Sequence, residues 1–136
     1  QTCSNGKGVL DEGERIRFLD IDTPTRSVVE YWLNVDEGTL SEPRLVLDLH
    51  DQTGFPDGMV ATPDGKSVII EFYNQDAAPH VEAVWTTELS PQVTCPLLMQ
   101  LQGSMKLILT TAVEHMSAER RATYPNAGCL FVGDFE

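Results

Sequence analysis

Basic residues are scarce in this sequence of 136 residues. Nine Lys and Arg stand against 21 Asp and Glu, which gives a formal net charge of −12 at pH 7. Proteins that bind nucleic acid need a basic face, so this charge argues against a nucleic-acid partner. The acidity indicates either an ordinary solvated surface or a negative field that attracts cations, and charge alone does not choose between them.

Long apolar runs are also missing. No run approaches the roughly 20 residues of a membrane-spanning helix, and no signal-peptide pattern opens the chain. Hydrophobic residues make up 41% of the chain and charged residues 22%, a composition typical of a globular protein rather than a disordered one. The sequence therefore predicts one domain with its own core and no membrane partner.

Cysteine is rare and widely spaced, at Cys3, Cys95 and Cys129. This spacing matches neither the paired C-x-x-C of a zinc site nor a dense disulfide framework. We expect free, buried thiols in a reducing compartment and hence a cytoplasmic protein, with a disulfide from Cys3 to another chain as the alternative. The first residue is Gln1 rather than Met, so N-terminal processing and secretion stay open.

The sequence has, instead, a repeat of turn signals and β-branched strands. Pro-Asp-Gly occurs at 56–58 and again at 63–65, and these three residue types are typical of turns. Asn5 lies 52 positions before Asp57, each is followed by Gly, and at the same offset Ile16 falls on Val68 without a gap. A weaker third copy begins near 94–95. The period indicates one supersecondary unit used repeatedly.

Short strands separated by turns fill each copy. We predict strands at 8–10, 15–22, 27–34 and 44–48, then at 67–73 and 81–87, then at 96–101, 106–113 and 128–132, with a helical turn at 117–121. Four antiparallel strands per repeat of 40–50 residues are typical of β-propeller blades. The prediction is one all-β domain over 1–136, with blades at approximately 1–50, 51–90 and 91–136.

Asn5 and Asp57 occupy the same position in successive predicted blades. The first strand of a blade lines the central channel, so two oxygen-bearing side chains would face one axis. Such a pair suits a hard cation. Asn-Gly and Asp-Gly are also favoured turn dipeptides, and the repeat alone leaves both interpretations open.

A set of motifs, in order along the chain, resembles the senescence-marker-protein/gluconolactonase/luciferin-regenerating-enzyme family, which includes regucalcin. The motifs are Cys3-Ser4-Asn5-Gly6, the strand at 18–23, the segments at 55–59 and 71–74, and the ending at 125–131. The resemblance covers nearly the whole chain and matches the family's C-terminal half. It implies a six-bladed propeller, of which this chain supplies about three four-stranded blades, with one divalent metal in the channel.

The resemblance also implies roles for individual residues. Asn5 and Asp57 match metal ligands, and Asp57 is in addition the candidate catalytic base. A neutral amide, carboxylates and waters suit calcium best, with zinc, manganese or magnesium as alternatives. The family's third ligand, a glutamate near its N-terminus, matches no position here. His115 is a weaker candidate for contact with substrate, and an ordinary loop histidine is the alternative.

These implications predict a metal-dependent hydrolase of the gluconolactonase type, which opens a sugar or related lactone by metal-activated water. The expected partners are a small-molecule lactone and a second chain that completes the propeller, either the N-terminal half or another copy. A non-catalytic calcium-binding or scaffold protein with an incomplete site is the alternative. A strictosidine-synthase-like propeller, which shares the architecture but not the Asn5/Asp57 pair, is a third interpretation.

Overall fold

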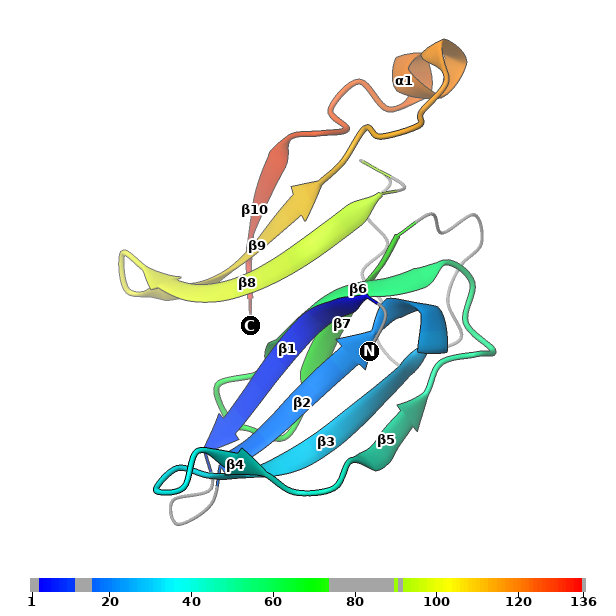
Figure 1. Cartoon of the computed structure of the whole chain (residues 1–136). Helices are drawn as coiled ribbons and strands as arrows, with labels where there is room; N and C mark the ends of the chain where they lie inside the picture. Colours follow the sequence, from blue (N-terminus) through cyan, green and yellow to red (C-terminus); the bar gives the residue numbers. More distant parts are fainter. Residues whose placement is uncertain (1–2, 12–15, 74–89, 91, 136) are drawn as a thin grey trace.

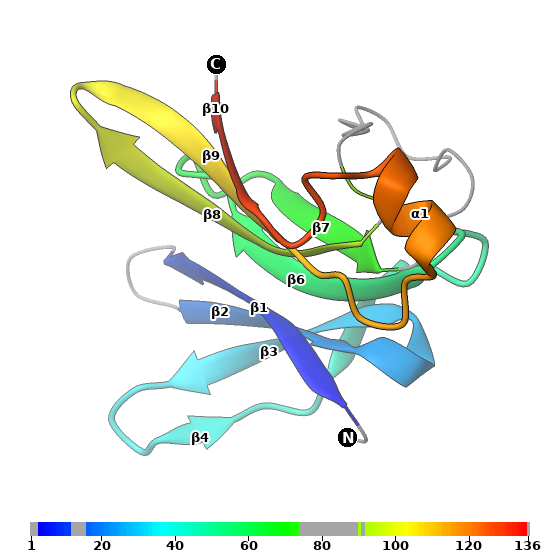
Figure 2. The same ribbon diagram turned by 90° about the horizontal axis from the view of Figure 1, so that it is seen from above.

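The chain forms antiparallel sheets arranged in succession, as a computed structural model shows. The structure describes residues 3–11, 16–73, 90 and 92–135, and in these residues the protein is mostly β-strand with one short α-helix. Three sheets follow one another along the sequence and lie side by side in the same order (Figures 1 and 2). The prediction of an all-β chain is therefore confirmed.

The first sheet contains five strands, in the order β1-β2-β3, with β4 and β5 both pairing with β3. Its elements are β1 (Ser4–Asp11), β2 (Ile16–Asp22), the 3-10 helix η1 (Thr23–Thr25), β3 (Ser27–Asn34), β4 (Thr39–Leu40) and β5 (Arg44–Asp48). Period-two alternation and β-branched residues predict β2, β3 and β5 within a residue of their observed bounds.

The middle sheet pairs β6 (Phe55–Ala61) with β7 (Val68–Tyr73). The predicted turn at 63–65 is confirmed, since Gly65 has φ +68° and its N–H donates to the carbonyl of Thr62. The predicted turn at 56–58 is wrong, because these residues lie inside β6, where the ladder continues on both sides of a bulge. The strand expected at 81–87 lies outside the described residues.

The third sheet has the order β10-β9-β8. It comprises β8 (Val93–Leu101), β9 (Ser104–Thr111) and β10 (Leu130–Asp134). Helix α1 (Ala118–Thr123) lies between β9 and β10, and Ser117 caps it by accepting a hydrogen bond from the N–H of Arg120 at 3.2 Å. The helical turn expected near 117–121 is confirmed.

The first strand of each sheet packs directly on the first strand of the next. A Cβ on Gly6 of β1 would lie 2.7 Å from the carbonyl oxygen of Asp57 in β6. A Cβ on Gly58 of β6 would lie 2.4 Å from the carbonyl oxygen of Thr94 in β8. Only glycine permits backbones to approach this closely. These two glycines therefore allow β1 to pack closely on β6, and β6 to pack closely on β8.

The buried core lies between the first and middle sheets. Its members are apolar residues of β1, β2, β3, β6 and the segment after β5: Leu10, Leu19, Ile21, Val28, Leu49 and Met59, with Ala61, Val68, Ile70 and Phe72 packed against them. Burial of these side chains is the main force that joins the two sheets.

The cysteines are free, as expected, but all three are exposed, so the prediction of buried thiols is wrong. No helix in the described part of the chain is long and apolar enough to span a bilayer.

Candidate metal and active site

The first strand of each sheet carries a β-bulge near its N-terminal end. The bulges contain the Asn-Gly pair at 5–6 in β1, the Asp-Gly pair at 57–58 in β6 and Thr94 in β8. A bulge re-aims the side chain that it carries, and bulges are common beside active sites. The repeat found in the sequence is thus a repeated backbone irregularity rather than a repeated turn.

The bulges of β1 and β6 bring Asn5 and Asp57 together. The Asn5 amide group donates a hydrogen bond to Thr23 Oγ1, at 3.2 Å, and lies near the Asp57 carboxylate, whose pKa it lowers. Thr23 Oγ1 in turn donates to the carbonyl of Pro56, at 2.8 Å. Thr23, which the sequence analysis did not select, therefore connects the two bulges.

The pKa of Asp57 is raised from its usual value. Burial of this half-buried carboxyl raises the pKa, because the charged form loses hydration, and the hydrogen bond from Asn5 opposes part of that rise. A carboxylate with a raised pKa is a better proton acceptor than an ordinary surface aspartate. Asp57 combines this property with a fixed orientation.

Glu71 is the residue that sequence reasoning missed. On β7, Phe72 pairs with Pro56 and Ile70 pairs with Met59, so Glu71 lies directly across from the Asp57–Gly58 bulge. Its side chain is buried, with 6% exposure, and neither carboxylate oxygen has a hydrogen-bond partner among the described residues. Burial, and next the charge of Asp57, raise the pKa of Glu71 to about 8. The available signal was one carboxylate within an otherwise apolar strand.

Tyr73 and Cys95 complete the surroundings of the two carboxylates. Partial burial, followed by the charges of Glu71 and Asp57, raises the pKa of the Cys95 thiol. Burial, followed by the charges of Glu114 and Asp57, raises the pKa of Tyr73. The middle and third sheets therefore meet at a cluster with negative potential.

The side chains at this cluster fit a hard cation better than a soft one. Within the described residues, no three His, Cys, Asp or Glu side chains form a group that could hold a metal. The set that remains is the Asp57 carboxylate with the amide oxygen of Asn5, whose N–H group donates to Thr23. Oxygen donors of this kind, supplemented by water, suit calcium.

His115 lies in the loop after β9. This loop follows the strand end that pairs with the start of β8, near the third bulge. The His115 side chain is 85% exposed, and its Nε2 lies 3.4 Å from Glu114 Oε1. Contact with substrate stays a prediction for this residue.

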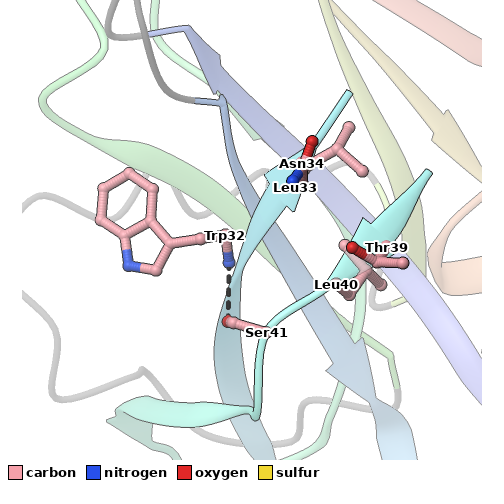
Figure 3. A pocket seen from close by; sticks show the side chains of 6 residues that line it. All are labelled: Trp32, Leu33, Asn34, Thr39, Leu40 and Ser41. Atoms are coloured by element: carbon pink, nitrogen blue, oxygen red, sulfur yellow. Dashed lines mark hydrogen bonds between the residues drawn. The ribbon is translucent and has the colours of Figure 1, made fainter. Parts of the chain in front are cut away.

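A separate hollow lies where β3 meets β4 (Figure 3). Its lining residues are Trp32, Leu33, Asn34, Thr39, Leu40 and Ser41. The backbone N–H of Trp32 donates a hydrogen bond to Ser41 Oγ at 3.0 Å. This end of β3 pairs with the start of β2, whereas Asn5 lies beside the far end of β2. The hollow is therefore not part of the site that contains Asn5 and Asp57.

Comparison with known proteins places this chain in a family. The model of the SMP-30/Gluconolactonase/LRE-like region matches residues 1–112. The chain is 28% identical, over 139 aligned residues, to a putative sugar lactone lactonase, YvrE, of Bacillus subtilis strain 168, covering 98% of this chain and 47% of that protein. It is 30% identical over 64 residues to an uncharacterized protein of Sulfolobus acidocaldarius, covering 47% of this chain and 22% of the other.

Two solved structures share the fold. The calcium-binding protein regucalcin from Agrobacterium tumefaciens strain C58 superposes with a TM-score of 0.75 at 19% identity, over 96% of this chain and 45% of regucalcin. A luciferin-regenerating enzyme gives a TM-score of 0.73 at 18% identity, over 96% of this chain and 44% of the enzyme. The chain spans about half the length of YvrE and of these two structures. Since the family model covers most of the sequence, the chain belongs to the SMP-30/Gluconolactonase/LRE-like family.

Proposed function

We propose that this chain carries the metal-binding part of a lactonase of the gluconolactonase type. One observation carries the proposal: two bulged strands of a chain in this family bring Asn5 and Asp57 side by side, with Thr23 Oγ1 bonded both to the Asn5 amide and to the carbonyl of Pro56. Asn5 and Asp57 are the proposed metal ligands, with calcium as the proposed ion. The relative from Bacillus subtilis, described as a putative sugar lactone lactonase, supports a sugar or related lactone as the substrate class.

The chain's own residues supply a base and its orientation. In lactone hydrolysis a water oxygen attacks the carbonyl carbon, the ring C–O bond breaks, and the ring oxygen takes a proton to give a hydroxy acid. Asp57 is the proposed acceptor of the water proton, and Asn5, anchored by Thr23, fixes its carboxylate. A bound divalent ion supplies polarisation of the lactone carbonyl.

The three sheets are the proposed three blades of a larger, six-bladed ring. The outward face of the third sheet is apolar: Leu97, Ile108 and Val132 form one cross-strand row, in which Leu97 is 50% exposed and Val132 is 55% exposed. At the other end of the chain, Val9 is 57% exposed and pairs with Phe18. Exposed apolar faces of this kind are typical of surfaces that pack against other protein.

Further blades of the same kind are the proposed cover for both faces. The lengths of the relatives support this, because each solved neighbour has about as much chain again as the part that matches. Native mass spectrometry of the assembly tests it. A second chain of similar size, or an uncleaved longer chain, is the expected result, and a dimer of two identical chains would assign the cover to another copy. A lone monomer would overturn the proposed ring.

A panel of aldonic-acid δ- and γ-lactones tests the activity. The assembly is stripped with EDTA and reloaded with Ca²⁺, and acid release is followed with a pH indicator. We expect hydrolysis that needs the ion and is lost in Asp57→Asn. Ion binding without hydrolysis of any lactone would instead identify a non-catalytic calcium-binding or scaffold protein.

A further inference from the structure

Within the described residues, the first sheet packs against the middle sheet on one face only (Figures 1 and 2). Leu19, Ile21 and Val28 lie on that face, in the core shared with the middle sheet. Successive side chains of a strand point to opposite faces, so Asp20 and Asp22 of β2 lie on the outward face. The proposed metal ligands and base make no use of this outward face.

The corresponding face of the middle sheet is covered. In both sheets one bulge interrupts the pairing of the first two strands, and it fixes which positions correspond. On the side of the bulge nearer the turn, Asp20 of β2 corresponds to Ile70 of β7, and on the other side Asp22 corresponds to Phe72. Ile70 and Phe72 pack against the core between the two sheets. The outward face of the first sheet therefore occupies the position of a face that, one sheet later, packs on its neighbour.

A hollow of about 200 Å³ lies on this outward face and is lined by Asp20 and Asp22. Its other lining residues are Thr25, Ser27, Val29, Tyr31 and Pro43. The hydroxyl oxygens of Thr25 and Ser27 lie 2.8 Å apart. Carboxyl and hydroxyl oxygens thus gather where the middle sheet has only apolar side chains.

Asp20 has a buried oxygen without a partner. The side chain is 1% exposed, and its Oδ1 forms an ion pair with Lys7. Its Oδ2 is buried and has no hydrogen-bond partner among the described residues. The Lys7 ammonium group is itself shared, because it also donates to the carbonyl of Asn5 at 2.8 Å. Buried carboxylates are normally paired or hydrogen-bonded, so Asp20 indicates a donor supplied from outside these residues.

We propose that the outward face of the first sheet docks a further blade that inserts an arginine side chain into the hollow lined by Asp20 and Asp22. This inference rests on the ring in the proposed function and deepens it, by naming the group that the cover presents. A planar guanidinium has five N–H donors in a fixed geometry, which suits a set of carboxyl and hydroxyl oxygens. Around the hollow, Val9 is 57% exposed and Leu45 is 58% exposed, and they would pack against the apolar stem of the arginine and its neighbours.

NMR titration of the 136-residue chain with N-acetylarginine amide tests the preference for a guanidinium. N-acetylcitrulline amide is the matched control, because it keeps the shape of the arginine probe and lacks its charge. We expect the arginine probe to shift the amide signals of residues 20–22 and 25–27, and the citrulline probe to bind about fivefold more weakly. Equal binding of the two probes, or no shift at these residues with either, would overturn the inference.

Two variants assign the shifts to the hollow. Asp20→Asn keeps the size of the side chain and should remove the shifts. Asp36→Asn is the control, since Asp36 is exposed in the turn between β3 and β4 and should leave the shifts unchanged. Shifts that decrease equally in the two variants would reveal a general effect of negative charge and would overturn the inference.

A crystal structure of the assembly tests the docking itself. We expect an arginine of the covering blade with guanidinium nitrogens about 3 Å from oxygens of Asp20 or Asp22. A covering blade that leaves the hollow without a cationic side chain would overturn this inference and leave the ring standing. A lone monomer would overturn the ring and this inference together, and failure to hydrolyse lactones would bear on neither.

Discussion

Glu30 and Glu71 are two buried glutamates that the same fold treats in opposite ways. Glu30 lies on β3 with Arg44 Nη2 2.6 Å from its Oε1 and Arg17 nearby, so its charge is compensated within the first sheet. Glu71 lies on β7 with Asp57 opposite and no hydrogen-bond partner among the described residues. The carboxylate of Glu30 is therefore paired within its own sheet, whereas that of Glu71 is unpaired and lies across from the Asp57–Gly58 bulge.

The difference separates a paired buried carboxylate from an unpaired one. Replacing Glu30 removes the ion-pair partner of Arg44, whereas replacing Glu71 removes a carboxyl group that has no hydrogen-bond partner among the described residues. Among the described residues, Glu71 is the buried carboxyl group with both oxygens unpaired, and it lies at the end of the sheets where the candidate site lies. Unfavourable local energetics of this kind are typical of functional sites.

The largest expected loss of stability comes from Gly58→Ala. This substitution should push β8 away from β6 and so change the surroundings of Glu71 but not those of Glu30. The new Cβ would lie 2.4 Å from the carbonyl oxygen of Thr94 and 2.6 Å from the Cα of Cys95, and these are backbone atoms that cannot turn aside. We expect a loss of about 3 kcal/mol in the free energy of unfolding, measured by urea denaturation. Gly133→Ala is the control, since a Cβ there meets nothing within 4 Å. Equal stability of the two variants would contradict the close junction.

Asp57→Asn removes the charge that lies across from Glu71. Asparagine keeps the shape and the contact with Asn5, but it offers a cation a neutral oxygen in place of a carboxylate. We expect calcium affinity to fall about 100-fold, which corresponds to about 2.7 kcal/mol, by calorimetry. Unchanged affinity would exclude Asp57 as a ligand.

Charge removal at the two glutamates should have opposite signs without metal. Glu30→Gln should destabilise the fold by about 2 kcal/mol, because it removes the carboxylate that pairs with Arg44 and lies beside Arg17. Glu71 has a pKa of about 8 in the folded chain against a usual 4.5. Between these values the unfolded chain binds fewer protons than the folded chain, so wild-type stability falls as pH rises from about 4.5 to 8.

Glu71→Gln should lack that pH dependence and be more stable than wild type by about 4 kcal/mol at pH 8. Urea denaturation in EDTA at pH 5, 6.5 and 8 measures the free energy of unfolding of wild type and of both glutamine variants. Destabilisation of similar size in the two would show that Glu71, like Glu30, has a structural partner.

Thr23→Val is the substitution with the smallest expected effect, and it tests the hydrogen bonds that connect the Asn5 and Asp57 bulges. Valine keeps the shape but removes the hydroxyl that accepts from Asn5 and donates to the carbonyl of Pro56. We expect a loss of about 1 kcal/mol in stability and a weakening of calcium binding by about fivefold. Thr25→Val is a matched control on the same 3-10 helix, because the Thr25 hydroxyl bonds only locally, to Asp22 and Ser27, in the described residues.

Much of the fold follows from local sequence signals. Alternation in 27–34 predicts β3 with its observed bounds, and the Pro-Asp-Gly at 63–65 predicts a real turn, with Gly65 at positive φ. The identical tripeptide at 56–58 misleads because its conformation is decided by neighbouring strands. Gly58 is needed there for close approach to Thr94, not for a turn.

The candidate site could be predicted only in part. Asn5 and Asp57 repeat at one period, and that signal is visible in the chain. Glu71 carries no such repeat, since Ile21 lies opposite the Asn5 bulge in the first sheet. The unpaired carboxyl of Glu71 depends on cross-strand register and on burial, which are set by packing between strands and sheets and not by any local pattern.

Thermal unfolding of wild type and Asp57→Asn, each with EDTA and with excess Ca²⁺ at pH 7.5, tests the central claim most directly. A ligand that binds only the folded chain stabilises it in proportion to the logarithm of its concentration over Kd. We expect Ca²⁺ to raise the Tm of wild type and to raise the Tm of Asp57→Asn much less, because the ion loses its carboxylate ligand in this chain. Calcium that shifts both proteins equally, or neither, would contradict a cation site at Asn5 and Asp57.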